Sequence, residues 1–274
     1  MTTGRRTLRD FSNLLALLGI GLVFALLDSK FLGARNLSLL MTELSITAIL
    51  ALGMLVIILP GHIDLSVGSG VGLLGGVAAV LVIRHDWPAP LAMAAAVVAG
   101  LALWLAMGTL IVRERMPAFI VTLGGLLLFK GLFWLVIQNS TIPVVRGGSV
   151  NLYSLLTTYY LPPLAGWALA MLVLAGLVTT QLAARRGRLA HGLAVEPAET
   201  LFLRLLVAAQ VLGLFVLVTN QYRGVPLPAV LLGAVALAVQ VLTRHTAFGR
   251  HLYAVGGNEA AARVSGVPMR RAVI

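Results

Sequence analysis

The sequence contains no cysteine, which excludes disulfides and cysteine-ligated metal sites. Charged residues are also scarce: Asp, Glu, Lys and Arg make up 11% of the 274 residues, against about a quarter in an ordinary soluble domain. Hydrophobic residues make up 59% of the chain. This balance indicates a membrane protein rather than a soluble domain.

Acidic residues are few beside basic ones, 9 against 20, and the formal net charge is +11. In a soluble protein this excess would suggest nucleic-acid binding. Here the basic residues lie between apolar segments and form no stripe with interleaved aromatic residues. The preference of cytoplasmic loops for Lys and Arg explains them. We therefore expect the lipid bilayer as a partner, and no nucleic acid.

Motifs of enzyme chemistry are absent from the sequence. It has no Gly-x-x-x-x-Gly-Lys-[Ser/Thr] loop for ATP phosphates and no Gly-x-Ser-x-Gly elbow. The apolar segments contain no histidine, and no aspartate at depth. The five histidines lie in separate loops, without helical pairing or neighbouring acidic ligands: His62, His85, His191, His245 and His251. We predict no catalytic residue, no metal site and no cofactor bound by this chain.

Eight continuous apolar segments account for most of the chain. Most reach the ~20 residues that a helix needs to cross a ~30 Å hydrocarbon core. Because lipid offers no hydrogen bonds, and because the runs do not alternate with period two, we expect helices. The sequence thus predicts an all-α polytopic membrane protein of about eight transmembrane helices. They cover approximately residues 11–27, 37–59, 65–83, 89–112, 117–137, 161–182, 201–218 and 226–242.

The orientation follows from the basic residues. If the N-terminus is cytoplasmic, successive spans place fourteen Lys and Arg residues inside and five outside, with Lys130 within a span. The bias holds at every loop, and inverting the protein would reverse it. We therefore predict that both ends are cytoplasmic and that residues 243–274 form a cytoplasmic loop.

The second and third apolar segments are joined by a short connection. Pro60 and Gly61 end the second segment, and the third follows almost at once, so we expect the two helices to be adjacent. Gly68, Gly72 and Gly76 then recur at four-residue spacing. Such spacing leaves one helix face without side chains, which favours close packing of another backbone.

Only two charged residues lie inside the predicted spans, Glu43 and Lys130. At similar depth the two could form an ion pair, or Lys130 could extend its ammonium group to the membrane surface. A proton- or sodium-coupled carrier normally has more buried carboxylates. The scarcity of such groups suggests that the energy for any transport enters from outside the chain.

The tail contains a short helix with its own end signals. Asn258 is a good N-cap, Glu259 follows in the first turn, and Glu259 and Arg263 are spaced for an i, i+4 ion pair. Gly266 supplies a stop. Such a helix could dock on a soluble partner or serve as a connector. The helix residues singled out are Asn258, Glu259, Ala260, Ala261, Ala262, Arg263 and Gly266, and residues 270–274 resemble the start of another helix.

Four segments in order resemble the bacterial ABC importer permeases of the ribose/xylose type, and a fifth resembles the coupling loop of ABC importer permeases. Residues 61–68 (GHIDLSVG) are similar to that family's Gly-x-Ile-Asp-Leu-Ser-Val-Gly signature. Residues 117–125 (PAFIVTLGG) resemble the start of its fifth span. Residues 222–226 (YRGVP) and 246–257 (TAFGRHLYAVGG) look most like xylose permeases, and the Glu-Ala-Ala…Gly pattern of 259–266 resembles the coupling loop.

The resemblance implies a subunit of an ATP-driven importer of a monosaccharide, such as the pentose xylose. It implies three partners: a cytoplasmic ABC ATPase that uses the ATP, an extracytoplasmic sugar-binding protein, and a second permease copy. Residues 258–267 would contact the ATPase. The signature residues would be Gly61, Asp64, Ser66 and Gly68. Family members continue beyond the coupling loop, so we expect an incomplete permease fold in the bacterial inner membrane, truncated at its C-terminus.

Other functions stay open at this point. A branched-chain amino-acid or nucleoside ABC permease has a similar coupling loop, although the xylose-like segments favour sugar. A secondary carrier or channel would need no ATPase, and a truncated chain could serve as a non-transporting scaffold. The residues singled out for a translocation path are Thr122, Phe119, Phe129 and Trp134, with Ser66, Ser69 and Gln210 as further polar candidates.

Overall fold

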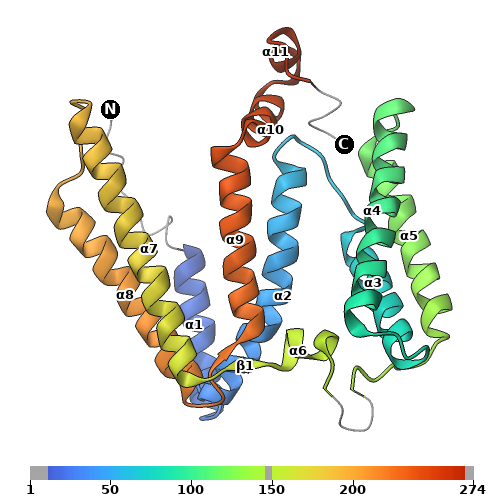
Figure 1. The fold of residues 1–274 in the computed structure, drawn as a ribbon, viewed down its shortest axis with the longest axis horizontal. Coiled ribbons are helices and arrows are strands. Elements are labelled where there is room, and N and C mark those ends of the chain that lie inside the picture. The colour runs from blue at the N-terminus through green and yellow to red at the C-terminus, as the bar shows by residue number, and fades with distance from the viewer. Residues whose placement is uncertain (1–11, 146–149, 269–274) are drawn as a thin grey trace. The chain divides into compact units, whose positions relative to one another are not determined.

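The computed structural model describes residues 12–145 and 150–268, and in these residues the chain is almost wholly helical (Figure 1). Two short strands, β1 and β2, pair antiparallel with Tyr160 opposite Pro226. The elements are α1 (Ser12–Leu27), α2 (Ala34–Ile58), α3 (Val67–Ile83), α4 (Ala89–Arg113), α5 (Ala118–Ile137), α6 (Leu152–Thr158), β1 (Tyr160–Leu161), α7 (Pro163–Ala190), α8 (Ala198–Asn220), β2 (Val225–Pro226), α9 (Leu227–His245), α10 (Ala247–Gly257) and α11 (Glu259–Val264).

All eight predicted apolar segments are helices, which confirms the all-α class. Among the described residues, six helices are long and apolar enough to cross a membrane: α2, α4, α5, α7, α8 and α9. The other two, α1 and α3, have 16 and 17 residues and fall below the ~20 needed to span the hydrocarbon core. The third predicted span was 65–83, but α3 begins two residues later, at Val67, because the preceding residues are not helical.

The chain divides into two units. Of the described residues, the first comprises 12–43 and 160–226, and the second comprises 44–145, 150–159 and 227–268. In the first unit, α7 and α8 pack as a hairpin. Gly166 of α7 allows β2 to approach, since a Cβ there would lie 2.9 Å from Val225 Cγ2. Gly224 adopts a φ of +106°, with the carbonyl oxygen of Leu161 filling the space that a Cβ would need.

The core of the second unit lies between α3, α4 and α5. Leu73, Met107, Val121 and Phe129 form a buried cluster, and the Trp104 ring lies 5.3 Å from the Phe129 ring, centroid to centroid. At the C-terminal end of α3, the Arg84 guanidinium donates to the side-chain oxygen of Gln138 and to the Ile137 carbonyl. These bonds tie the ends of α3 and α5 together.

Around α3, one packing prediction is wrong and another holds only in part. The helix packs on α4 and α5 rather than on α2, because the non-helical residues 59–66 carry the chain away from the end of α2. Of the three spaced glycines, Gly76 alone meets a neighbour, the Phe133 ring, among the described residues. Gly68 and Gly72 face open space.

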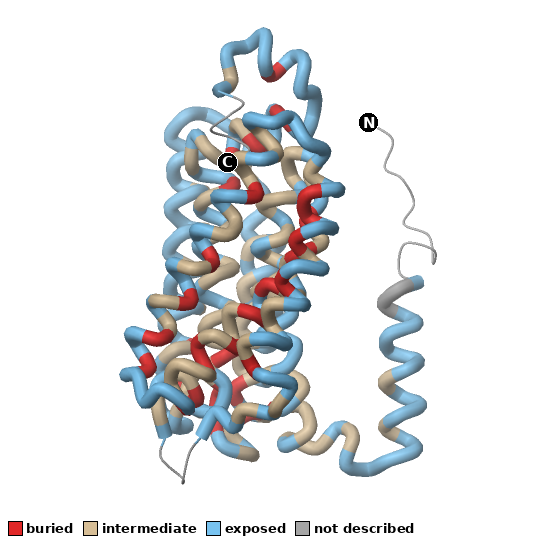
Figure 2. The backbone as a smooth tube through the Cα atoms, turned by 90° about the vertical axis from the view of Figure 1, so that its right-hand side faces the viewer, coloured by how far each residue is buried: buried red, intermediate tan, exposed pale blue. Residues whose placement is uncertain are grey.

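Many large apolar side chains of the helices are exposed. Buried positions, red in Figure 2, form short stretches separated by exposed turns. In α7, none of the most apolar 18-residue window is buried, and Leu164 is 85% exposed. In a bilayer, lipid acyl chains would cover such apolar surfaces, so this pattern agrees with helices that lie in a membrane.

The predicted cytoplasmic loop is largely helical. Its first part, α10, was not foreseen; it follows α9 after a sharp turn in which the Thr246 side chain accepts from the Gly249 N–H. A Cβ on Gly249 would lie 2.1 Å from the Thr243 carbonyl oxygen, so this turn needs glycine. The second part, α11, is the predicted helix. The further helix expected at 270–274 lies outside the described residues.

Candidate functional site

The connection between α2 and α3 is extended and enters the helical unit. Gly61 turns the chain at a φ of +93°, a conformation that favours glycine. Asp64 and Ser66 are both buried, with 7% and 0% of their surface exposed. Residues 61–68, which carry the signature pattern, are called the signature loop below.

Asp64 is the centre of this loop. Its Oδ1 accepts from the backbone N–H of Ser66 at 2.7 Å and from the Ser66 hydroxyl at 2.5 Å. Its Oδ2 accepts from the indole Nε1 of Trp104 at 2.9 Å. Three donors therefore stabilise one buried carboxylate, and the Ser66 N–H at the start of α3 gains an acceptor.

The depth of Asp64 was not foreseen from the sequence. Trp104 lies nine residues before Arg113, the last residue of α4, which corresponds to about 14 Å along the helix axis. Asp64 contacts α4 at that level. The apolar spans themselves contain no aspartate, as predicted, but residues 59–66 enter between the helices instead of forming a loop at their ends, and they bring Asp64 with them.

Helix α5 holds the other side of the signature loop. The Thr122 hydroxyl lies 3.3 Å from the Ile63 carbonyl oxygen, to which it donates. Gly125 allows close contact, since a Cβ there would lie 3.2 Å from Ser66 Cβ and 3.0 Å from the Met107 methyl group. Contacts with α4 on one side and α5 on the other thus stabilise the loop.

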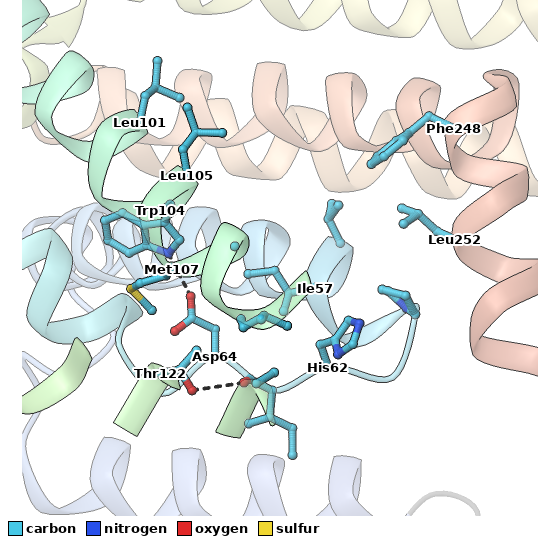
Figure 3. Close-up of a pocket in the computed structure, with 16 residues that line it drawn as sticks. Ile57, His62, Asp64, Leu101, Trp104, Leu105, Met107, Thr122, Phe248 and Leu252 are labelled. Atoms are coloured by element: carbon cyan, nitrogen blue, oxygen red, sulfur yellow. Dashed lines mark hydrogen bonds between the residues drawn. The ribbon is translucent and has the colours of Figure 1, made fainter. Parts of the chain in front are cut away.

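A cavity of about 300 Å³ lies beside the signature loop (Figure 3). Its walls are mainly apolar side chains of α2 and α4, such as Ile57 and Leu105. His62, Asp64 and Thr122 supply the polar groups. A mostly apolar hollow with a few placed polar groups is typical of a small-molecule site.

Helix α10 closes one side of this cavity. Phe248 and Leu252 line it, and Leu252 is almost fully buried. The backbone of α10 also touches the end of α2: a Cβ on Gly256 would lie 1.8 Å from the Leu59 carbonyl oxygen. Movement of α10 would therefore displace both the end of α2 and the cavity wall.

Helix α11 has the capped ends that the sequence predicts. The Asn258 side chain accepts from the Ala261 N–H at 2.9 Å, and the Glu259 and Arg263 side chains form an ion pair at 2.8 Å. Gly266 ends the helix with a φ of +80°. Ala262 packs against Val255 of α10, whereas the rest of α11 is exposed.

The residues singled out for a translocation path do not converge on one surface. Thr122 lines the cavity, Phe129 is buried in the core, and Phe119 and Trp134 are exposed. Ser69 donates to the Ser66 carbonyl, and Gln210 is exposed in the other unit. Glu43 and Lys130 belong to different units, so their pairing stays a prediction.

Sequence reasoning missed Trp104, Leu252 and Gly256. Trp104 lies in an apolar run, where nothing distinguishes a hydrogen-bonding indole from one that faces lipid. For α10, the signal was present in Thr246, an N-cap residue that precedes an amphipathic stretch.

Comparison with known proteins decides the family. Residues 36–274 match the family described as "Branched-chain amino acid transport system / permease component". The chain belongs to this family. No solved structure matches the chain.

Curated relatives of this permease family include sugar permeases. The chain is 39% identical over 267 residues to the xylose transport system permease protein XylH of Escherichia coli K12, covering 96% of the chain. It is 37% identical over 245 residues to XylH of Haemophilus influenzae, covering 89%. It is 30% identical over 264 residues to the ribose import permease protein RbsC of Escherichia coli K12, covering 96%.

The chain spans somewhat under two thirds of these relatives, namely 66%, 64% and 63% of their lengths. Membership of the permease family and the six candidate spans together identify a multi-pass inner-membrane protein. Helix α10 is close to both features singled out by resemblance: Phe248 and Leu252 share the cavity with the signature loop, and Val255 packs against Ala262 of α11.

Proposed function

We propose that this chain is the membrane-spanning subunit of an ATP-driven importer of a monosaccharide, a pentose such as xylose. The 39% identity to XylH over 96% of the chain supports this substrate class. Its partners would be a cytoplasmic ABC ATPase, an extracytoplasmic sugar-binding protein and a second copy of the permease. ATP would be bound and hydrolysed by the ATPase alone.

The contact between Gly256 of α10 and Leu59 at the end of α2 carries the proposal. An exposed helix that is only tethered to a membrane domain transmits nothing. Here α11 packs on α10 through Ala262 and Val255, and α10 touches α2 without an intervening side chain. A force applied to α11 would therefore reach the spans.

The proposed cycle uses this connection. The ATPase would dock on α11, which carries the exposed Glu259 and Arg263 side chains. When the ATPase domains close, α10 would shift and move the end of α2, the signature loop and the wall formed by Leu252. The spans would then alternate between outward- and inward-facing states. This cycle requires the predicted orientation, with α10 and α11 in the cytoplasm.

The test is sugar uptake into vesicles that contain the purified chain with a candidate ABC ATPase and a candidate sugar-binding protein from the same organism. Labelled xylose, ribose and leucine are compared, with and without ATP. We expect ATP-dependent uptake of a pentose and no uptake of leucine. Leucine uptake would favour an amino-acid permease. Pentose uptake that follows a proton or sodium gradient without the ATPase would favour a secondary carrier.

Two variants test whether α11 couples the ATPase to the spans. Glu259→Gln together with Gly266→Ala should lower sugar-stimulated ATP hydrolysis, since both residues shape the docking helix. Arg244→Gln, a change of charge at the end of α9, should leave it unchanged. Equal ATP hydrolysis by the α11 variant and the unmodified chain would exclude α11 as the docking element.

A further inference from the structure

A second pocket lies in the first unit, between the ends of α7 and α8. Its volume is about 330 Å³. Three arginines line it, Arg185, Arg188 and Arg204, together with one carboxylate, Glu196. The lining therefore has a net charge of +2. We call this hollow the α7–α8 pocket.

The loop between the helices holds these side chains in place. The Arg185 guanidinium donates to the Glu196 carbonyl, and Arg188 Nε donates to the Ala194 carbonyl at 3.0 Å. Arg204 forms an ion pair with the Glu196 carboxylate at 2.8 Å. A guanidinium has five N–H donors, and Arg188 uses its Nε–H for the loop, which leaves the outer nitrogens directed away from that bond. Such prearranged guanidinium groups match a phosphate group.

The length of α7 places the pocket at the membrane surface. With 28 residues, α7 is about 42 Å long, whereas the hydrocarbon core is about 30 Å thick. If α7 enters the core near Pro163, about 20 residues cross it and the boundary falls near residue 183. Arg185 and Arg188 then lie just beyond, at the level of lipid head groups.

Apolar side chains continue from the pocket toward the hydrocarbon core. Leu177 and Leu182 are exposed on the turns of α7 that precede the lining residue Arg185. A free phosphate ion would gain nothing from these residues. A phospholipid would place its phosphate among the arginines and its acyl chains along this apolar surface.

We propose that the α7–α8 pocket binds the head group of an anionic phospholipid such as phosphatidylglycerol. The three arginines would contact the phosphate, and the exposed leucine side chains of α7 would contact the acyl chains. The site is separate from the cavity beside Asp64, and it depends on the membrane location of the chain rather than on ATP coupling.

Native mass spectrometry of the detergent-purified chain tests the proposal by titration with dioleoylphosphatidylglycerol. The double variant Arg185→Gln/Arg188→Gln should bind this lipid about 25-fold more weakly, at about fivefold for each arginine near an anionic head group. The matched control is Arg186→Gln, which removes one arginine from the same turn of α7 but none from the lining. It should retain binding within about twofold.

A variant that is expected to bind the lipid more tightly distinguishes a loss of binding from misfolding. Glu196→Gln removes the one negative charge of the lining and should tighten binding several-fold, which a damaged fold would not do. The exposed Arg204–Glu196 pair contributes little to stability, so the loop should persist. Dioleoylphosphatidylcholine should bind more weakly than phosphatidylglycerol.

Three results would overturn the proposal. Undiminished lipid binding by the double variant would show that the lipid does not bind in the α7–α8 pocket. An equal loss in Arg186→Gln would show that attraction is diffuse along α7. Complete displacement of phosphatidylglycerol by millimolar inorganic phosphate would identify a site for free phosphate instead of a lipid.

Discussion

Trp104 and Asp64, forty residues apart in the chain, are joined by a 2.9 Å hydrogen bond from the indole Nε1 to the carboxylate Oδ2. This bond connects α4 to an extended segment that enters between the helices. Non-helical backbone at such depth is tolerated where protein groups satisfy it. Asp64 accepts from the backbone N–H of Ser66 at the start of α3, and the Trp104 indole donates to the same carboxylate.

Asp64→Ala should therefore destabilise the protein by about 2 to 4 kcal/mol, because the Ser66 and Trp104 donors would lose their buried acceptor. Unfolding in mixed detergent micelles, followed by circular dichroism, measures the change. The control Asp28→Ala removes an exposed carboxylate that accepts from Lys30 N–H, and should change stability by less than about 0.5 kcal/mol.

A double-mutant cycle with Trp104→Phe isolates the bond between the two side chains. We expect a coupling free energy of about 0.5 to 3 kcal/mol. A coupling near zero would mean that Trp104 stabilises the unit through its ring alone.

Gly70→Ala should destabilise the second unit by about 1 to 3 kcal/mol, because the new Cβ would lie 2.2 Å from the Trp104 ring. Gly72→Ala is the matched control on the same helix, since no atom lies within 4 Å of its Cβ position. That variant should be neutral or more stable by up to about 1 kcal/mol. Thermal unfolding of both variants in one detergent compares them, and equal effects would contradict the packing described here.

Most helices could be predicted from the sequence because a long apolar run in lipid satisfies its backbone hydrogen bonds by forming a helix. The sequence also predicted α11, since Asn258, the Glu259–Arg263 pair and Gly266 are local signals that act within one turn of the helix. These predictions required no knowledge of which helices touch.

What sequence reasoning missed depends on contacts between distant segments. Gly70 and Gly125 are essential to packing because Trp104 and Met107 lie against them, whereas the regularly spaced Gly68 and Gly72 meet nothing in the described residues. Spacing along one helix does not reveal what lies opposite. The depth of Asp64 was missed for the same reason, since a short connection was taken to lie at the ends of its helices.

Gly256→Ala should uncouple the proposed ATPase-docking segment from the spans. A Cβ at this position would lie 1.8 Å from the Leu59 carbonyl oxygen, and backbone cannot yield as a side chain can, so α10 must move away from α2. We expect sugar-stimulated ATP hydrolysis by the assembled importer to fall at least tenfold. Gly257→Ala, with open space at its Cβ, is the control and should retain activity. Equal activity of both variants would show that the α10–α2 contact transmits nothing.

Asn258→Ala should loosen α11 without unfolding the protein. The Asn258 side chain accepts from the Ala261 N–H at 2.9 Å, and loss of such a cap costs about 1 kcal/mol of helix stability. Amide exchange in residues 259–264 should therefore become about fivefold faster, while exchange in α4 and α5 stays the same. Glu259→Gln provides the comparison: its ion pair with Arg263 is exposed and contributes less than about 0.5 kcal/mol, so exchange should change less than twofold. Similar acceleration in both variants would assign the stability of α11 to the ion pair rather than to the cap.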